Sequence, residues 1–144
     1  MGTESNISKV RELIEEGFSR GNVQVADRLV ALDCIERQRG QKPGADGVKE
    51  TIRTLHRWFS DFRLVVEEVV ADGDRVWTRN TATGVNTGEV MGMAPTGKPI
   101  EITVFDEVRF DNGVIVEHWG VADQLGMLLQ LGMIPRHQKV ATGG

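Results

Sequence analysis

The amino-acid sequence predicts an α+β domain in which helices near the N-terminus pack on one face of a curved antiparallel sheet. Up to about residue 60, apolar residues recur at helical spacing, whereas beyond residue 62 they alternate at the spacing of strands. Helices and strands that are segregated along the chain are typical of this class. A chain of 144 residues fits one domain, so we expect a single domain over 1–144 with a pocket between the sheet and the helices.

Three helices are expected before the strands. A first helix over 6–20 is indicated by apolar residues at spacings of three and four: Ile7, Val10, Ile14 and Phe18. A second helix is expected at 23–32, and the polar, glycine-containing segment 36–47 is expected to be a loop. A third helix is expected at about 47–60, with Asp46 as its N-cap.

After residue 60 the period changes to that of strands. Four runs rich in Val, Ile and Thr are expected to be strands: 62–71, 75–85, 100–110 and 114–122. Segment 86–98 is expected to be a loop, and Asp123 is expected to cap a short closing helix rather than to take part in catalysis.

The composition of the chain argues against several classes of function. The net charge of -4 argues against a nucleic-acid partner, and no apolar run is long enough to span a membrane. A single cysteine, Cys34, excludes an internal disulfide and fits a reducing cytoplasm. The chain has no tyrosine, no nucleotide-binding glycine motif and no histidine pair at metal-ligand spacing. We therefore expect a cytoplasmic protein with no cofactor and no metal, which performs acid–base chemistry or binds a small molecule.

Asp106 is the most informative position, because it interrupts an otherwise apolar strand face. That face is formed by alternate residues: Ile102, Val104, Val108 and Phe110. A carboxylate that points into an apolar pocket is suited to proton transfer. The alternative is an aspartate at the edge of the sheet that binds a neighbouring backbone group.

The hairpin at 111–113 decides which residue faces Asp106. A three-residue loop closed by glycine places Asp106 opposite His118, and such a pair is a general acid–base device. A two-residue turn at 112–113 places Asp106 opposite Trp119 instead. The three-residue loop is the predicted register.

Several other side chains are candidate substrate contacts: Arg37, Trp58, Trp77, Asn80, Met91 and Trp119. The tryptophans and Met91 could line an apolar cavity, although core packing also explains such residues. Arg37 could bind a substrate oxygen, or it could belong to a solvated loop. Asn80 could donate a hydrogen bond into the pocket, or it could lie at a sheet edge.

Several short motifs together resemble a known family. They occupy residues 73–76, 83–84, 95–98, 109–113, 116–120 and 130–132. This pattern resembles the SnoaL-like polyketide cyclases of the NTF2-like superfamily, and the resemblance extends from the first helix to Ile134-Pro135. The Glu-His-Trp stretch at 117–119 is its most specific part.

The resemblance implies an NTF2-like cone, with a curved sheet around a deep apolar pocket, no metal or organic cofactor, and a homodimer or higher homo-oligomer. Family members close rings in polyketide intermediates, typically by aldol condensation with Asp and His in the pocket; related proteins open epoxides or are proposed to catalyse [4+2] closures. Asp106 falls at the family's pocket-facing acid–base position. Gly120 and Arg37 stand where many relatives carry Asp and His, which favours a variant ring closure.

The resulting expectation is a cyclase of natural-product (antibiotic) biosynthesis that acts on a bulky, apolar polyketide. Asp106 would be the main acid or base and His118 its partner, in an aldol-type or template-assisted reaction. Two alternatives stay open. An epoxide hydrolase or epoxide-opening cyclase would need a second carboxylate near Asp106. A non-catalytic small-molecule-binding module would lack converging polar groups.

Overall fold

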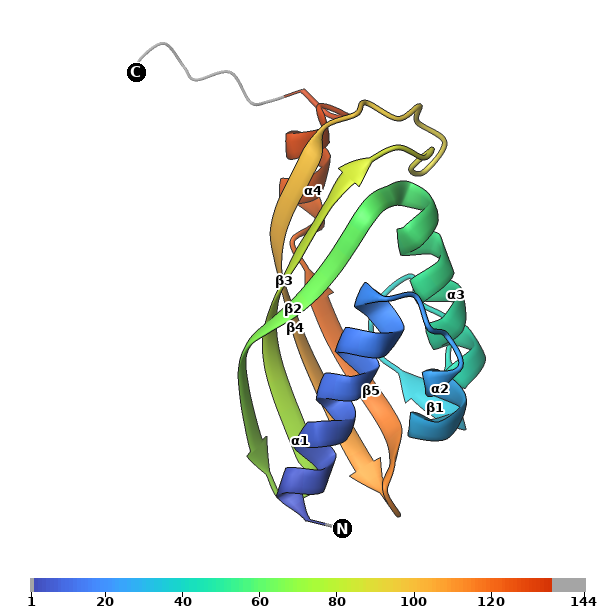
Figure 1. Ribbon diagram of the computed structural model, residues 1–144, viewed down its shortest axis with the longest axis vertical. Coiled ribbons are helices and arrows are strands. Elements are labelled where there is room, and N and C mark those ends of the chain that lie inside the picture. Colours follow the sequence, from blue (N-terminus) through green and yellow to red (C-terminus); the bar gives the residue numbers. More distant parts are fainter. Residues whose placement is uncertain (1, 136–144) are drawn as a thin grey trace.

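The computed structural model describes residues 2–135 and confirms the α+β class. Its elements run in the following order: α1 (Thr3–Glu12), η1 (Leu13–Ser19), α2 (Val25–Leu29), β1 (Val30–Glu36), α3 (Gly44–Trp58), β2 (Phe59–Asp72), β3 (Arg75–Asn86), β4 (Pro99–Asp111), β5 (Val114–Ala122) and α4 (Gln124–Leu131). Figure 1 shows α1, α2 and α3 on one side of a long, twisted sheet, with α4 at one end. Within residues 2–135, no helix combines the length and the apolar character that a membrane-spanning helix needs.

The sheet is mixed rather than wholly antiparallel. Its strand order is β1-β5-β4-β3-β2, and β1 runs parallel to β5. The expectation of helix to residue 32 was wrong, because α2 ends at Leu29 and the chain continues as β1. The loop expected at 36–47 is present but shorter, since it occupies residues 37–43 between β1 and α3. This edge strand lacks a clean alternation, since its register shifts between Val30 and Ile35 and Leu32 is 80% exposed. The periodicity of the sequence therefore did not indicate a strand.

The first and third helices lie close to their expected positions. The second half of the first helix is a π-helix, η1, in which Arg20 N donates to Glu15 O at 3.2 Å. The expected N-cap of the third helix was wrong, because α3 begins at Gly44 after Pro43 and has no side-chain cap. Asp46 lies in its first turn, where a negative charge favours the helix dipole.

The β4–β5 hairpin differs from both registers considered above. Its turn consists of Asn112 and Gly113, with φ of 51° and 79°, and so has two residues. Relative to the predicted three-residue loop, this two-residue turn shifts the strand pairing by one residue. A bulge between Arg109 and Phe110 shifts the pairing by one residue more, so Asp106 pairs with Gly120 and not with His118 or Trp119. The two shifts sum to two residues, which is the side-chain period of a strand, so Asp106 and His118 share a face.

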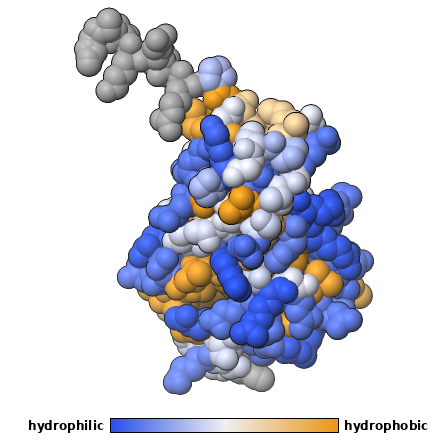
Figure 2. Space-filling view, turned by 45° about the horizontal axis from the view of Figure 1, so that its top comes forward, coloured by the Kyte–Doolittle hydropathy of each residue, from blue (hydrophilic) through white to orange (hydrophobic). Residues whose placement is uncertain are grey.

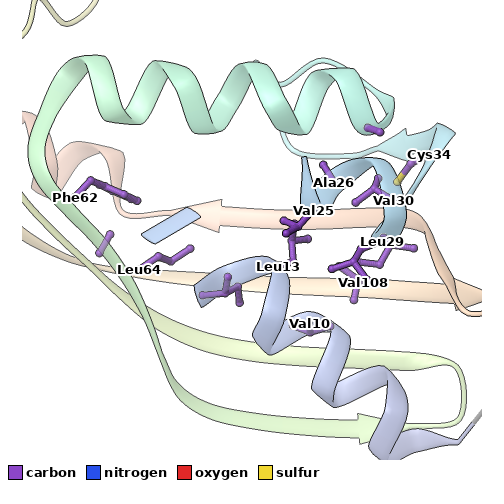
Figure 3. Packing of buried hydrophobic residues seen from close by; sticks show 14 of the residues in the cluster. Val10, Leu13, Val25, Ala26, Leu29, Val30, Cys34, Phe62, Leu64 and Val108 are labelled. Carbon is purple, nitrogen blue, oxygen red and sulfur yellow. The ribbon is translucent and has the colours of Figure 1, made fainter. Parts of the chain in front are cut away.

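The core lies between the helices and the inner face of the sheet. Leu13, Leu29 and Val108, from η1, α2 and β4, belong to one cluster of buried side chains (Figure 3). Along β3, residues alternate between this buried face and a more exposed outer face. The face seen in Figure 2 is mostly hydrophilic, with separate hydrophobic areas.

Asn86 ties the loop after β3 to the end of α3. Its fully buried side chain donates to Trp58 O at 3.1 Å and to Gly88 O at 2.9 Å, and it accepts from Thr96 N at 2.7 Å. One amide therefore satisfies three backbone groups, which holds both ends of the loop against the helix.

We predict that Asn86→Leu lowers the free energy of unfolding by about 2–3 kcal/mol, because it removes three hydrogen bonds that the Asn86 side chain makes to the backbone. Urea denaturation measures this change, and hydrogen exchange at the Thr96 amide should become faster. Asn22→Leu, at an exposed position, is the matched control. A loss no larger than that of the control would contradict this role.

Candidate active site

A cavity of about 210 Å³ lies among the helices and the inner face of the sheet. Most of its lining is apolar and includes Val10, Leu13, Phe62, Ile102 and Met127. Its polar lining includes Glu36, Gln38, Thr78, Asp106 and His118. An apolar pocket with a few converging polar groups is the usual form of a small-molecule site.

His118 lies between two carboxylates in this cavity. Its Nε2 is 2.7 Å from Asp106 Oδ1, and its Nδ1 is 2.6 Å from Glu36 Oε2. The parallel pairing of β1 with β5 places Glu36 beside His118, whereas the bulged β4–β5 hairpin supplies Asp106. An imidazole donates from both nitrogens only when it is protonated, so this geometry fits an imidazolium ion.

The electrostatics of His118 agree with that geometry. Burial alone lowers its pKa, but the hydrogen bonds to Asp106 and Glu36 outweigh burial and raise the pKa to about 9. The side chains of His118, Asp106 and Glu36 are 21%, 19% and 7% exposed. His118 is therefore a cation at neutral pH, held in a fixed orientation by two anionic partners.

Asp106 is also held from behind. Asn80 Nδ2 donates to Asp106 Oδ2 at 2.9 Å and to Thr78 Oγ1 at 3.0 Å. The Asn80 side chain is fully buried, and within the described chain its Oδ1 has no hydrogen-bond partner. Asp106 thus has one oxygen on His118 and the other on Asn80, which fixes the plane of its carboxylate.

Gly120 provides the space for this arrangement. It is the residue directly paired with Asp106, and a Cβ there would lie 2.8 Å from Asp106 Oδ1 and 2.9 Å from His118 Cε1. The same Cβ would collide with Gln38 Oε1. The absence of a side chain at this position therefore allows three polar side chains to meet.

Comparisons with known proteins agree with this fold. The profile described as SnoaL-like polyketide cyclase matches residues 8–131. The chain belongs to the SnoaL-like polyketide cyclase family. A comparison with curated proteins gave no significant match.

Solved structures similar to this SnoaL-like protein include two from Streptomyces. IdmH from Streptomyces antibioticus, a proposed polyketide cyclase, is 32% identical, with 88% of this chain and 98% of that chain covered and a TM-score of 0.77. AclR from Streptomyces galilaeus, a proposed hydroxylase, is 26% identical, with coverages of 98% and 89% and a TM-score of 0.84. A Catenulispora acidiphila protein with a ketosteroid isomerase-like fold is 14% identical, with coverages of 88% and 93% and a TM-score of 0.72, and this likeness shows the fold alone.

Of the other candidate residues of this SnoaL-like chain, some line the cavity and others lie outside it. Trp58 lines the cavity, whereas Asn80 lies behind Asp106 rather than in the lining. Met91 is half exposed on the loop after β3, with a φ of 50°, and it does not belong to the cavity lining. Asp123 caps α4, as expected, by accepting from Gly126 N at 2.9 Å.

Arg37, Trp77 and Trp119 do not line the cavity. Both tryptophans alternate with inward-facing neighbours, so they lie on the outer face of the sheet. Arg37 Nε donates to Glu117 Oε2 at 2.9 Å, and its guanidinium lies 6.0 Å from the Trp119 ring. The expectation that these three residues contact substrate in the pocket is therefore not met by their positions.

Glu36 and Gln38 are the site residues that sequence reasoning missed. Both fall in the segment interpreted as a loop: Glu36 is the last residue of β1, whose irregular edge pairing gives no periodic signal, and Gln38 lies in the turn that follows it. Cys34 also lines the cavity, but burial and the neighbouring carboxylates raise its pKa to about 11, so its thiol stays protonated. In the described chain, no group of three or more His, Cys, Asp or Glu side chains is arranged to hold a metal ion.

We predict that stability falls as the pH rises from 6.5 to 9. The pKa of His118 is raised on folding, so its contribution is complete below 6.5 and is lost as the pH passes about 9. That contribution amounts to about 3 kcal/mol. Urea denaturation across this range measures it. His118→Gln should lack the loss in this window, and equal slopes for the two proteins would refute the assignment.

We also predict that Gly120→Ala separates His118 from Asp106. The added methyl group overlaps both side chains, so the pKa of His118 should fall toward 6.5, and stability should decrease by about 1–3 kcal/mol. NMR titration of the His118 ring measures the pKa. Val121→Ala, on the outer face, is the control. An unchanged His118 titration would show that the space above Gly120 is not critical.

Proposed function

We propose that the protein closes a ring in a bulky, mostly apolar polyketide intermediate of natural-product biosynthesis, and that it needs no cofactor to do so. One observation carries this proposal: a fixed Asp106–His118–Glu36 array faces an apolar cavity in a SnoaL-like chain. Such a cavity can fold a flexible apolar chain and hold its reactive carbons near a carboxylate.

In the aldol form of this reaction, Asp106 is the base. Its carboxylate accepts from His118 and Asn80 and still has lone pairs for a substrate proton. Asp106 takes a proton from the carbon next to a carbonyl group, and the C–H electron pair forms an enolate. The enolate carbon then bonds to a second carbonyl carbon, and the resulting alkoxide receives the proton back from Asp106. The product is a ring of unchanged mass.

His118 supports this step as a fixed cation. Its positive charge stabilises the Asp106 carboxylate in the apolar site, and Glu36 holds the ring from the opposite side. A template-assisted closure, including a [4+2] reaction, would instead use the shape of the cavity and would need no proton transfer.

Epoxide opening is the second candidate, and Glu36 is the observation that favours it. This chemistry uses one group to protonate the epoxide oxygen and another to activate the attacking group. The structure holds two carboxylates on either side of His118. A purely binding module is less well supported, because polar side chains converge on one side of the cavity.

We predict that Asp106→Asn slows ring closure of a linear poly-β-ketone at least about 100-fold, since it removes the proton acceptor. Mass spectrometry and NMR of the product establish whether a ring forms without loss or gain of mass. Asp111→Asn, on the exposed end of the same hairpin, is the matched control. Full turnover by Asp106→Asn would exclude the proton-transfer mechanism and favour the template mechanism.

A further inference from the structure

Two glutamine side chains line the cavity and have no part in the chemistry described above. Gln38 and Gln41 begin and end the turn that follows β1, in which Gln41 N donates to Gln38 O at 3.2 Å. Gly40, with a φ of 87°, supplies the left-handed conformation within this turn. Both glutamines belong to the cavity lining. The turn therefore presents two amide side chains beside the polar end of the pocket.

This turn is fixed at both ends. Arg37 N donates to His118 O at 2.8 Å, and Gln38 N donates to Glu36 Oε2 at 2.9 Å. At the other end, the Thr51 hydroxyl of α3 donates to Gln41 Oε1. The turn is thus attached to the two strands that carry His118 and Glu36, and its position relative to the site is set by the fold. Such preorganisation lowers the entropic cost of binding a ligand.

The amide N–H groups of this turn are available to a ligand. Among residues 2–135, the Gln38 side chain makes no hydrogen bond, and Gln41 uses only its oxygen. Gln38 Oε1 and Asp106 Oδ1 both lie close to Gly120. A neutral amide group that lines a mostly apolar cavity can donate to an acceptor such as a carbonyl oxygen.

We propose that Gln38 and Gln41 form a carbonyl-binding subsite. It would hold a keto or enolate oxygen beside Asp106 while the apolar body of the ligand fills the rest of the cavity. The ligand class is therefore an amphipathic ketone, with its oxygens at one end. This inference rests on the proposed function, since it defines how the substrate of that reaction is oriented.

The test compares two probes of nearly equal shape, the bicyclic ketone 1-tetralone and its hydrocarbon analogue tetralin. Dissociation constants are measured by NMR titration of the wild-type protein, Gln38→Met, Gln41→Met and the control Gln24→Met, whose glutamine is exposed and away from the cavity. Methionine keeps the length of glutamine and removes its hydrogen bonds. Thermal unfolding confirms that each variant is folded.

Loss of one hydrogen bond should weaken 1-tetralone binding about three- to tenfold in Gln38→Met and in Gln41→Met. Tetralin binding should be unchanged in both, and Gln24→Met should match the wild type. The subsite is refuted if both variants bind 1-tetralone as the wild type does, if both probes weaken equally, or if neither probe binds the wild-type protein. The cyclase proposal is judged separately, by ring closure in Asp106→Asn, so either proposal can fail alone.

Discussion

The hydrogen bonds of a protonated His118 to Asp106 and Glu36 are the interaction on which the site depends. Three ionisable side chains in a partly desolvated cavity are costly unless each is paired and oriented. The parallel pairing of β1 with β5 supplies Glu36, and the bulged β4–β5 hairpin supplies Asp106. Gly120 leaves room for the Asp106 and His118 side chains to meet. Each of these features is a departure from a regular antiparallel sheet, and together they bring the three groups to one place.

The alternation at the end of β1 connects the outer face of the sheet to the cavity. Glu36 points inward to His118, Arg37 points outward to Glu117, and Gln38 points inward again. Glu117 is buried and also accepts from Arg109 Nε at 3.0 Å, so two arginines hold its carboxylate and keep its pKa below the ordinary value against the opposing effect of burial. Arg37 directly follows Glu36 in the chain. The Arg37–Glu117 ion pair on the outer face therefore helps to hold Glu36 against His118 on the inner face.

Much of the fold follows from the sequence, and the parts that do not have identifiable physical causes. The strand segments beyond residue 60 alternate clearly, so β2 to β5 were predicted within a few residues of their ends. The edge strand β1 is irregular and carries exposed apolar residues, which hides its period. A β-bulge leaves no periodic signal, so the pairing of Asp106 could not be read from the sequence. Asp106 still contacts His118, because the strand pairing is shifted by two residues in all, which leaves both side chains on the same face of the sheet. Asp106 was identifiable as a polar residue in an apolar pattern, whereas Glu36 lay where no strand was expected.

The protonation of His118 assigns the roles within the site. Because its hydrogen bonds to Asp106 and Glu36 raise its pKa to about 9, His118 is mainly protonated at neutral pH and is poorly suited to accept a substrate proton. Both of its N–H groups are already directed to carboxylates, which makes it a positioned cation rather than a base. In the proposed aldol reaction the base is then a carboxylate, and Asp106, which lines the apolar cavity with Asn80 behind it, fits that role. This distribution of charge also explains why a nearby carbonyl-binding group would help catalysis: the enolate oxygen develops negative charge beside Asp106, and neutral amide donors can stabilise it without forming a competing ion pair.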